Sequence, residues 1–165
     1  QFGRSMKELG VEVICANTPH LVYEHVQPRI GIPILHIADA TGRAAASRGL
    51  KTLGLLGNKP TMTGDFIPGR LQTEFGIETL IPEEPSIPKS HYFISRELTH
   101  GKFTEEARRF YTTQIGLLRD RGADGIILGC TELPLLIREE DVDVPLLATT
   151  DLHAEMAVDF ILERD

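Results

Sequence analysis

The chain alternates short apolar runs, rich in β-branched residues, with segments that carry helix-start signals. The clearest run, residues 125–128, is apolar throughout and is soon followed by polar residues. A strand that is apolar on both faces is typical of a parallel sheet covered by helices on both sides. Parallel strands are joined by right-handed crossover connections, usually helices. The alternation therefore predicts an α/β fold with parallel sheets, in which ligands bind at the carboxyl ends of strands.

Turn and cap residues place the individual elements. Strands are expected at residues 11–15, 32–37, 51–57, 77–81, 125–128 and 144–148. Helices are expected from residue 18 or 19 onward, at 38–48, 91–100 and 104–121, and from residue 149 or 150 onward. Residues 58–63 are expected to form a loop or the start of a helix, and residues 82–88, with three prolines, a loop. Residues 2–9 have the pattern of a helix end and the chain begins with Gln1, so we expect an N-terminal portion to be missing.

Composition narrows the class of protein and of partner. With 165 residues, 41% of them hydrophobic and 25% charged, the chain can bury a core and is not a disordered tail. The formal net charge of −7, with no basic cluster, argues against binding to nucleic acid or anionic membranes. No apolar run approaches the roughly 20 residues of a membrane span. Two cysteines and no signal peptide favour a reducing, cytoplasmic location.

The two cysteines occupy equivalent places in the pattern. Cys15 and Cys130 each follow an apolar strand and precede polar residues at a predicted helix start. Backbone N–H groups there favour anions and can lower the pKa of a thiol toward neutrality. Two opposed thiols could remove a proton from one face of a carbon and return one to the other. The alternative is that both are small buried hydrophobic residues near strand ends.

Cofactor and metal motifs are absent from the sequence. No strand is followed by GxGxxG, no GxxxxGK[ST] occurs, and the glycines of residues 54–57 have the wrong spacing for either. His20 and His25 are five residues apart and so do not share a helix face. We therefore expect neither a cofactor nor a bound metal.

Three segments, in order, resemble the motifs of the aspartate/glutamate racemase family. Residues 14–20 resemble its CxNTxH segment, residues 55–62 its LLGTxxTM segment, and residues 127–133 its ILGCTE segment. The similarity extends over essentially the whole chain. It implies a cofactor-independent amino-acid racemase that forms a homodimer and acts on a small-molecule amino acid.

The resemblance also implies a domain organisation. Two α/β lobes, each a mostly parallel sheet flanked by helices, would be related by a pseudo-twofold axis, with the active site in the cleft between them. The first lobe would comprise residues 1–38 plus 149–165, and the second residues 39–148. The first lobe is expected to be incomplete, because the family's first strand and Gly-rich loop would precede Gln1.

The same resemblance assigns roles to individual residues. Cys15 and Cys130 would exchange the Cα proton on opposite faces of the substrate, and Lys102 would bind the distal carboxylate of an acidic amino acid. Glu132 favours the aspartate racemase branch, and Asn58 stands where the family commonly has Thr. Four further residues, with nearby backbone N–H groups, would hold the α-carboxylate: Asn17, Thr18, Thr61 and Thr131.

Simpler roles and other reactions remain open. Thr18 and Thr131 are typical helix caps, Asn17 is a turn former, Thr61 can start a helix, and Lys102 can be a solvated surface lysine. Related two-cysteine enzymes isomerise maleate, racemise hydantoins or decarboxylate arylmalonates. A fragment that binds carboxylates without chemistry is the remaining alternative.

Overall fold

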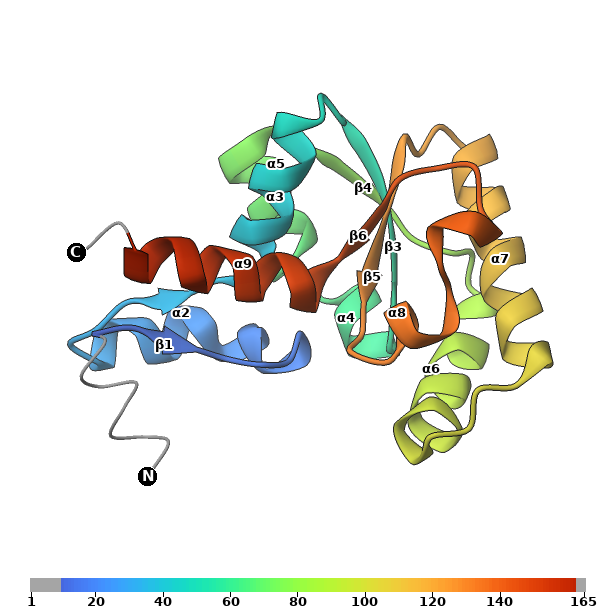
Figure 1. Ribbon diagram of the computed structural model, residues 1–165, viewed down its shortest axis with the longest axis horizontal. Helices are drawn as coiled ribbons and strands as arrows, with labels where there is room; N and C mark the ends of the chain where they lie inside the picture. The colour runs from blue at the N-terminus through green and yellow to red at the C-terminus, as the bar shows by residue number, and fades with distance from the viewer. Residues whose placement is uncertain (1–9, 163–165) are drawn as a thin grey trace.

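Two parallel sheets organise the computed structural model, which describes residues 10–162 (Figure 1). The smaller sheet pairs β1 (Glu12–Val13) with β2 (Ile34–Leu35). The larger sheet has the order β4-β3-β5-β6, formed by β3 (Thr52–Gly57), β4 (Glu78–Leu80), β5 (Gly125–Gly129) and β6 (Leu146–Ala148). Every strand pair is parallel, so the predicted α/β class with parallel sheets is confirmed.

Strand β5, between β3 and β6, determines which residues emerge at one end of the larger sheet. All five of its residues are buried, as its uniformly apolar sequence predicts. Its register with β3 runs from Leu53 opposite Gly125 to Gly57 opposite Gly129. Both strands therefore end at the same level, and the residues that follow them, Asn58 and Cys130, emerge at one edge of the sheet.

The helices cover both faces of the larger sheet. Along β5, Ile126 and Leu128 point to one apolar cluster while Ile127 points to another. α6 (Ser86–Arg96) and α7 (Glu105–Asp120) cover the first face, and α3 (Ile37–Ser47) and α5 (Pro68–Phe75) cover the second (Figure 1). The remaining helical segments are η1 (Thr18–Val22), α2 (Tyr23–Val26), η2 (Gln27–Arg29), α4 (Lys59–Thr63), η3 (Leu98–His100), α8 (Leu133–Leu136), η4 (Glu139–Asp141) and α9 (Thr149–Leu162).

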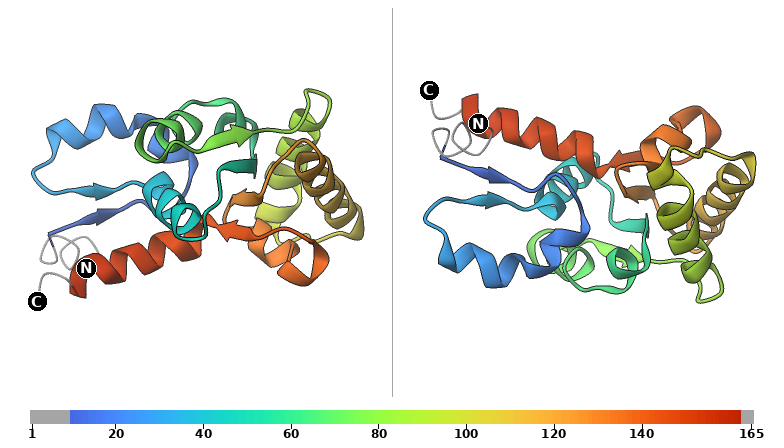
Figure 2. Two further views of the ribbon diagram at one scale, coloured as in Figure 1. Left: turned by 90° about the horizontal axis from the view of Figure 1, so that it is seen from above. Right: turned by 90° about the horizontal axis from the view of Figure 1, so that it is seen from below.

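α9 connects the larger sheet to the smaller one. It starts directly after β6 and runs beside β1 and β2 (Figure 2). Its Met156 packs with Val11, Leu35 and Ala40 in a small third apolar cluster. No helix within residues 10–162 is long and apolar enough to cross a membrane.

Several element boundaries differ from the sequence-based expectation. The strand predicted at 32–37 is shortened to β2, because His36 caps α3 by accepting the Ala38 N–H through Nδ1. The loop predicted at 82–88 ends at Ser86, where α6 begins, because Pro88 falls in the first turn of the helix, where an N–H is not needed. α5 was not predicted. The helix end expected at residues 2–9 lies outside the described residues.

Candidate active site

Segments that follow three different strands line one small cavity of about 180 Å³. Its lining comprises residues 16–19 from the first cysteine segment, Asn58, residues 129–132 from the second cysteine segment, and Ile94 and Thr99. The volume lies below the roughly 300 Å³ at which pockets for drug-sized ligands begin. The cavity therefore suits a molecule of few heavy atoms.

Cys130 lies at the end of β5 and lines the cavity with a side chain that is 8% exposed. Its thiol donates a hydrogen bond to Oε2 of Glu132 at 2.9 Å, and the Thr131 hydroxyl donates to the same oxygen at 2.6 Å. Burial, followed by the hydrogen bond to Glu132, raises the pKa of Cys130 to about 12. Partial burial acts to raise the pKa of Glu132, but the two donated hydrogen bonds outweigh it and the pKa falls below its usual value.

The expectation that a helix start lowers the pKa of this thiol is therefore wrong for Cys130. α8 begins only at Leu133 and is four residues long, so its dipole is small. Removal of the thiol from water and the adjacent carboxylate both disfavour the thiolate, and together they exceed the effect of nearby backbone N–H groups.

Cys15 has a different environment despite its similar sequence context. It lies between β1 and η1, is exposed, and has its Sγ 3.9 Å from the carbonyl oxygen of Val13. The four residues that follow it line the cavity, whereas Cys15 itself is not among the lining residues. The helix predicted after it is a 3-10 helix that starts at Thr18, and the Asn17 side chain makes no cap hydrogen bond.

Asn58, Thr18 and Thr61 form a hydrogen-bonded network at one side of the cavity. The Asn58 side chain caps α4, since its Oδ1 accepts the Thr61 N–H at 2.9 Å, and its Nδ2 donates to Thr18 Oγ1 at 3.0 Å. The two threonine hydroxyls are 3.2 Å apart. Thr61 is fully buried and does not line the cavity, so its contact is with Thr18.

Asn17 links the first cysteine segment to the larger sheet. Its Nδ2 donates to Thr149 Oγ1 at 3.0 Å, and that hydroxyl donates to the carbonyl oxygen of Leu128 at 3.1 Å. Asn17 is 4% exposed, and its Oδ1 has no hydrogen-bond partner among the described residues. This chain of hydrogen bonds joins Asn17, which lines the cavity, to Leu128 in β5, which directly precedes the second cysteine segment.

Lys102 is a third predicted site residue, with Cys15 and Thr61, that does not line the cavity. It is exposed in the loop after η3 and is not among the lining residues. Sequence reasoning missed Ile94 and Thr99, which line the cavity from the end of α6 and from η3. The apolar spacing of α6 could have placed Ile94 on a buried face, whereas no sequence signal distinguished Thr99.

Within residues 10–162, no three His, Cys, Asp or Glu side chains are arranged to hold a metal ion.

A sequence model of the Asp/Glu/Hydantoin racemase family matches residues 8–157. The chain belongs to this family. Among curated relatives, a glutamate racemase from Hydrogenobaculum sp. (strain Y04AAS1) is 30% identical over 132 residues, which cover 79% of this chain and 48% of the relative. The chain thus spans about half the length of the curated relatives it matches.

Solved structures of the racemase family agree with the fold. A Yersinia pestis protein, provisionally assigned as an Asp/Glu racemase, is 39% identical with a TM-score of 0.89, over 96% of this chain and 70% of that one. An aspartate racemase homologue from Pyrococcus horikoshii OT3 is 32% identical with a TM-score of 0.82, over 93% of this chain and 67% of that one. A glutamate racemase from Francisella tularensis shares the fold at 18% identity, with a TM-score of 0.73.

Proposed function

We propose that this racemase-family chain inverts the Cα of a small acidic amino acid, without a cofactor, by proton exchange between Cys15 and Cys130. The observation that carries the proposal is the convergence of both cysteine segments on one small cavity at the carboxyl ends of β3 and β5. Such strand ends are the usual place for a ligand in parallel sheets. The family names both acidic amino acids and hydantoins, and the cavity's small volume fits a ligand of few heavy atoms.

The two thiols would divide the work according to their surroundings. Cys130 is held as a thiol by burial and by Glu132, so it carries the proton that would be delivered to Cα. The thiolate of Cys15 would take the Cα proton on the opposite face, and the electron pair left on Cα would delocalise into the substrate carboxylate. Protonation by Cys130 then inverts the centre and leaves a Cys130 thiolate. The reverse reaction uses the two groups in exchanged roles.

Neutral donors would bind the substrate's α-carboxylate. Thr18, Asn58 and Thr131 line the cavity with hydroxyl and amide groups, and within residues 10–162 no cationic side chain is among those that line it. Glu132, which is ionised at neutral pH, would sit beside the substrate ammonium group. Lys102 would bind the distal carboxylate once the loop after η3 folds toward the cavity wall that Thr99 already forms.

The proposal also keeps the two-lobe division expected from the sequence, a cytoplasmic location and a homodimer. The division would place the boundaries at Ala38, within the first turn of α3, and at Thr149, the start of α9. Sedimentation velocity at the concentrations used for activity measures the assembly.

Exchange of the Cα hydrogen in deuterated water tests the chemistry. We expect NMR to detect deuterium incorporation with one or both enantiomers of aspartate or glutamate, and its loss in Cys15→Ser and Cys130→Ser. A matched control is Ser47→Cys, which adds an exposed thiol on α3 and should leave exchange unchanged. Binding of the amino acid without exchange would instead support a carboxylate-binding fragment, and turnover of maleate or a hydantoin alone would support a related reaction.

A further inference from the structure

Three buried histidines from separate elements stack behind the Cys15 segment. His20 lies in η1, His36 caps α3, and His153 lies in α9; none is more than 2% exposed. The ring of His20 is in the middle, with its centroid 4.8 Å from that of His36 and 5.5 Å from that of His153, both edge-on. The proposed reaction does not use any of these imidazoles.

The protonation pattern of His20 follows from its partners. Its Nδ1 is 2.9 Å from the carbonyl oxygen of Ala16 and 3.3 Å from that of Asn17. Carbonyl oxygens only accept hydrogen bonds, so Nδ1 carries the proton and donates. Burial lowers the pKa of His20, which keeps the ring neutral and leaves Nε2 unprotonated. The Nδ1–H group of His20 therefore holds the carbonyls of the two residues that directly follow Cys15.

The neighbouring rings are fixed to the backbone. His36 Nδ1 accepts the Ala38 N–H at 3.1 Å, and His153 Nε2 donates to the carbonyl oxygen of Leu35 at 2.9 Å. His20 is therefore confined between two anchored rings. The rings of His36, at the start of α3, and His153, in α9, fix the position of the His20 ring. Through its hydrogen bonds to the Ala16 and Asn17 carbonyls, His20 in turn fixes the segment that follows Cys15.

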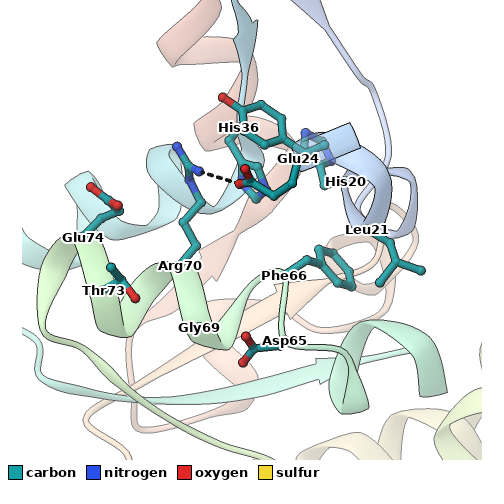
Figure 3. Close-up of a pocket in the computed structure, with 11 residues that line it drawn as sticks. His20, Leu21, Glu24, His36, Asp65, Phe66, Gly69, Arg70, Thr73 and Glu74 are labelled. Carbon is teal, nitrogen blue, oxygen red and sulfur yellow. Dashed lines mark ion pairs between the residues drawn. The ribbon is translucent and has the colours of Figure 1, made fainter. Parts of the chain in front are cut away.

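The outer side of the stack borders a second cavity of about 410 Å³ (Figure 3). Figure 3 shows His20 and His36 on one side of this cavity and Arg70, on α5, paired with Glu24. Arg70 also forms a two-point ion pair with Asp39, in which its Nε and Nη2 each donate to one carboxylate oxygen. Because this cavity borders the His20 ring, replacing His20 with alanine would let the η1 segment shift into the open space. Variants that keep a side chain of similar size are more informative.

We propose that His20 is a positioning residue for Cys15, acting through the hydrogen bonds from its Nδ1 to the Ala16 and Asn17 carbonyls. The inference rests on the proposed function in that Cys15 is a reacting thiol. The hydrogen bonds and the ring packing are separable. His20→Asn keeps a donor near the position of Nδ1 and loses the ring, whereas His20→Phe keeps a ring of similar size and loses the donor.

The first measurement needs no racemase activity. In the Cys130→Ser background Cys15 is the only thiol, so the rate of its reaction with iodoacetamide reports the geometry and exposure of its segment. We expect His20→Phe to change this rate by about tenfold, the equivalent of one lost buried hydrogen bond, and His20→Asn to stay within about twofold. His25→Phe, a change at a histidine outside the stack, is the matched control and should leave the rate unaltered.

The second measurement is Cα exchange in chains that keep both cysteines. We expect kcat to fall with His20→Phe and to be rescued in His20→Asn, with KM little changed in either variant. If His20→Phe matches the unsubstituted chain while His20→Asn is impaired, the ring acts by packing alone and the inference is overturned. Equal rates in both variants overturn it as well. If the unsubstituted chain does not exchange Cα hydrogen, the proposed function fails, while the alkylation rates still decide the role of His20.

Discussion

Replacing Glu132 with Gln tests directly how the carboxylate controls Cys130. The substitution removes one negative charge and keeps an oxygen that can accept the thiol hydrogen bond. The thiolate would then form without an anion 2.9 Å away. We therefore expect the pKa of Cys130 to fall from about 12, although burial, the larger cause, keeps it above the ordinary value of about 8.5 for a thiol.

The size of the shift follows from Coulomb's law. Two unit charges about 3 Å apart interact by about 1.4 kcal/mol in water and by about 5 kcal/mol at the effective dielectric constant near a protein surface. Since about 1.4 kcal/mol corresponds to one pKa unit, the limits are about one and about four units. Glu132 is partly exposed, which screens its charge, so we expect a fall of about one unit.

Thiol–disulfide exchange with a small aromatic disulfide measures this shift in the Cys15→Ser background. At a fixed, mildly alkaline pH, a fall of one pKa unit raises the thiolate fraction about tenfold, but the less basic thiolate is less nucleophilic. The net rate should rise about threefold. Glu78→Gln is the control, because β4 starts at the end of the sheet opposite Cys130. A rate that is unchanged or lower in Glu132→Gln would refute the electrostatic account.

Two further predictions concern stability. Leu118→Ala should lower the free energy of unfolding by about 3 kcal/mol in urea titrations, because Leu118 is fully buried beneath the sheet; Leu117→Ala, at a residue that is 51% exposed, should cost less than about 1 kcal/mol. Burial, with weaker contributions from His20, Arg70 and His153, lowers the pKa of His36 from 6.5 to about 3, so the folded state prefers the neutral ring. The free energy of unfolding should then fall as the pH drops from about 6.5 toward 3. His36→Asn, which can still accept the cap hydrogen bond, should make this free energy depend less steeply on pH. An equal pH dependence in both proteins would contradict this assignment.

The strongest local signals in the sequence predicted the larger sheet and its main helices. The apolar run of β5 and the Thr104 cap of α7 gave element positions within a residue or two of those in the structure, because each signal reflects a local physical requirement. α5 gave no such signal. Its Ile67 N-cap makes no side-chain cap hydrogen bond, and the helix is stabilised by burial of Leu71 against the sheet.

Much of the candidate site was also visible in the sequence. Cys130, Thr131, Glu132 and Asn58 line the cavity because β3 and β5 end at one edge of the larger sheet; Asn17 and Thr18 reach the same cavity from the segment after β1, in the smaller sheet. Asn58, which stands where the family commonly has Thr, still provides hydrogen bonds. Its amide caps α4 and donates to Thr18. The positions of Lys102 and Thr99 depend on how the chain turns around η3, and no local pattern determines that turn.

The two cysteines show why similar sequence contexts need not give similar chemistry. Both follow a strand, but β5 is the fully buried strand between β3 and β6, whereas β1 is two residues long and half-exposed. Cys130 consequently loses water and gains a carboxylate partner, while Cys15 remains exposed. A two-base exchange needs one thiol that can deliver a proton to Cα. Burial at the end of β5 favours the protonated form of Cys130 and the Glu132 carboxylate reinforces it, so Cys130 should carry its proton in the free protein.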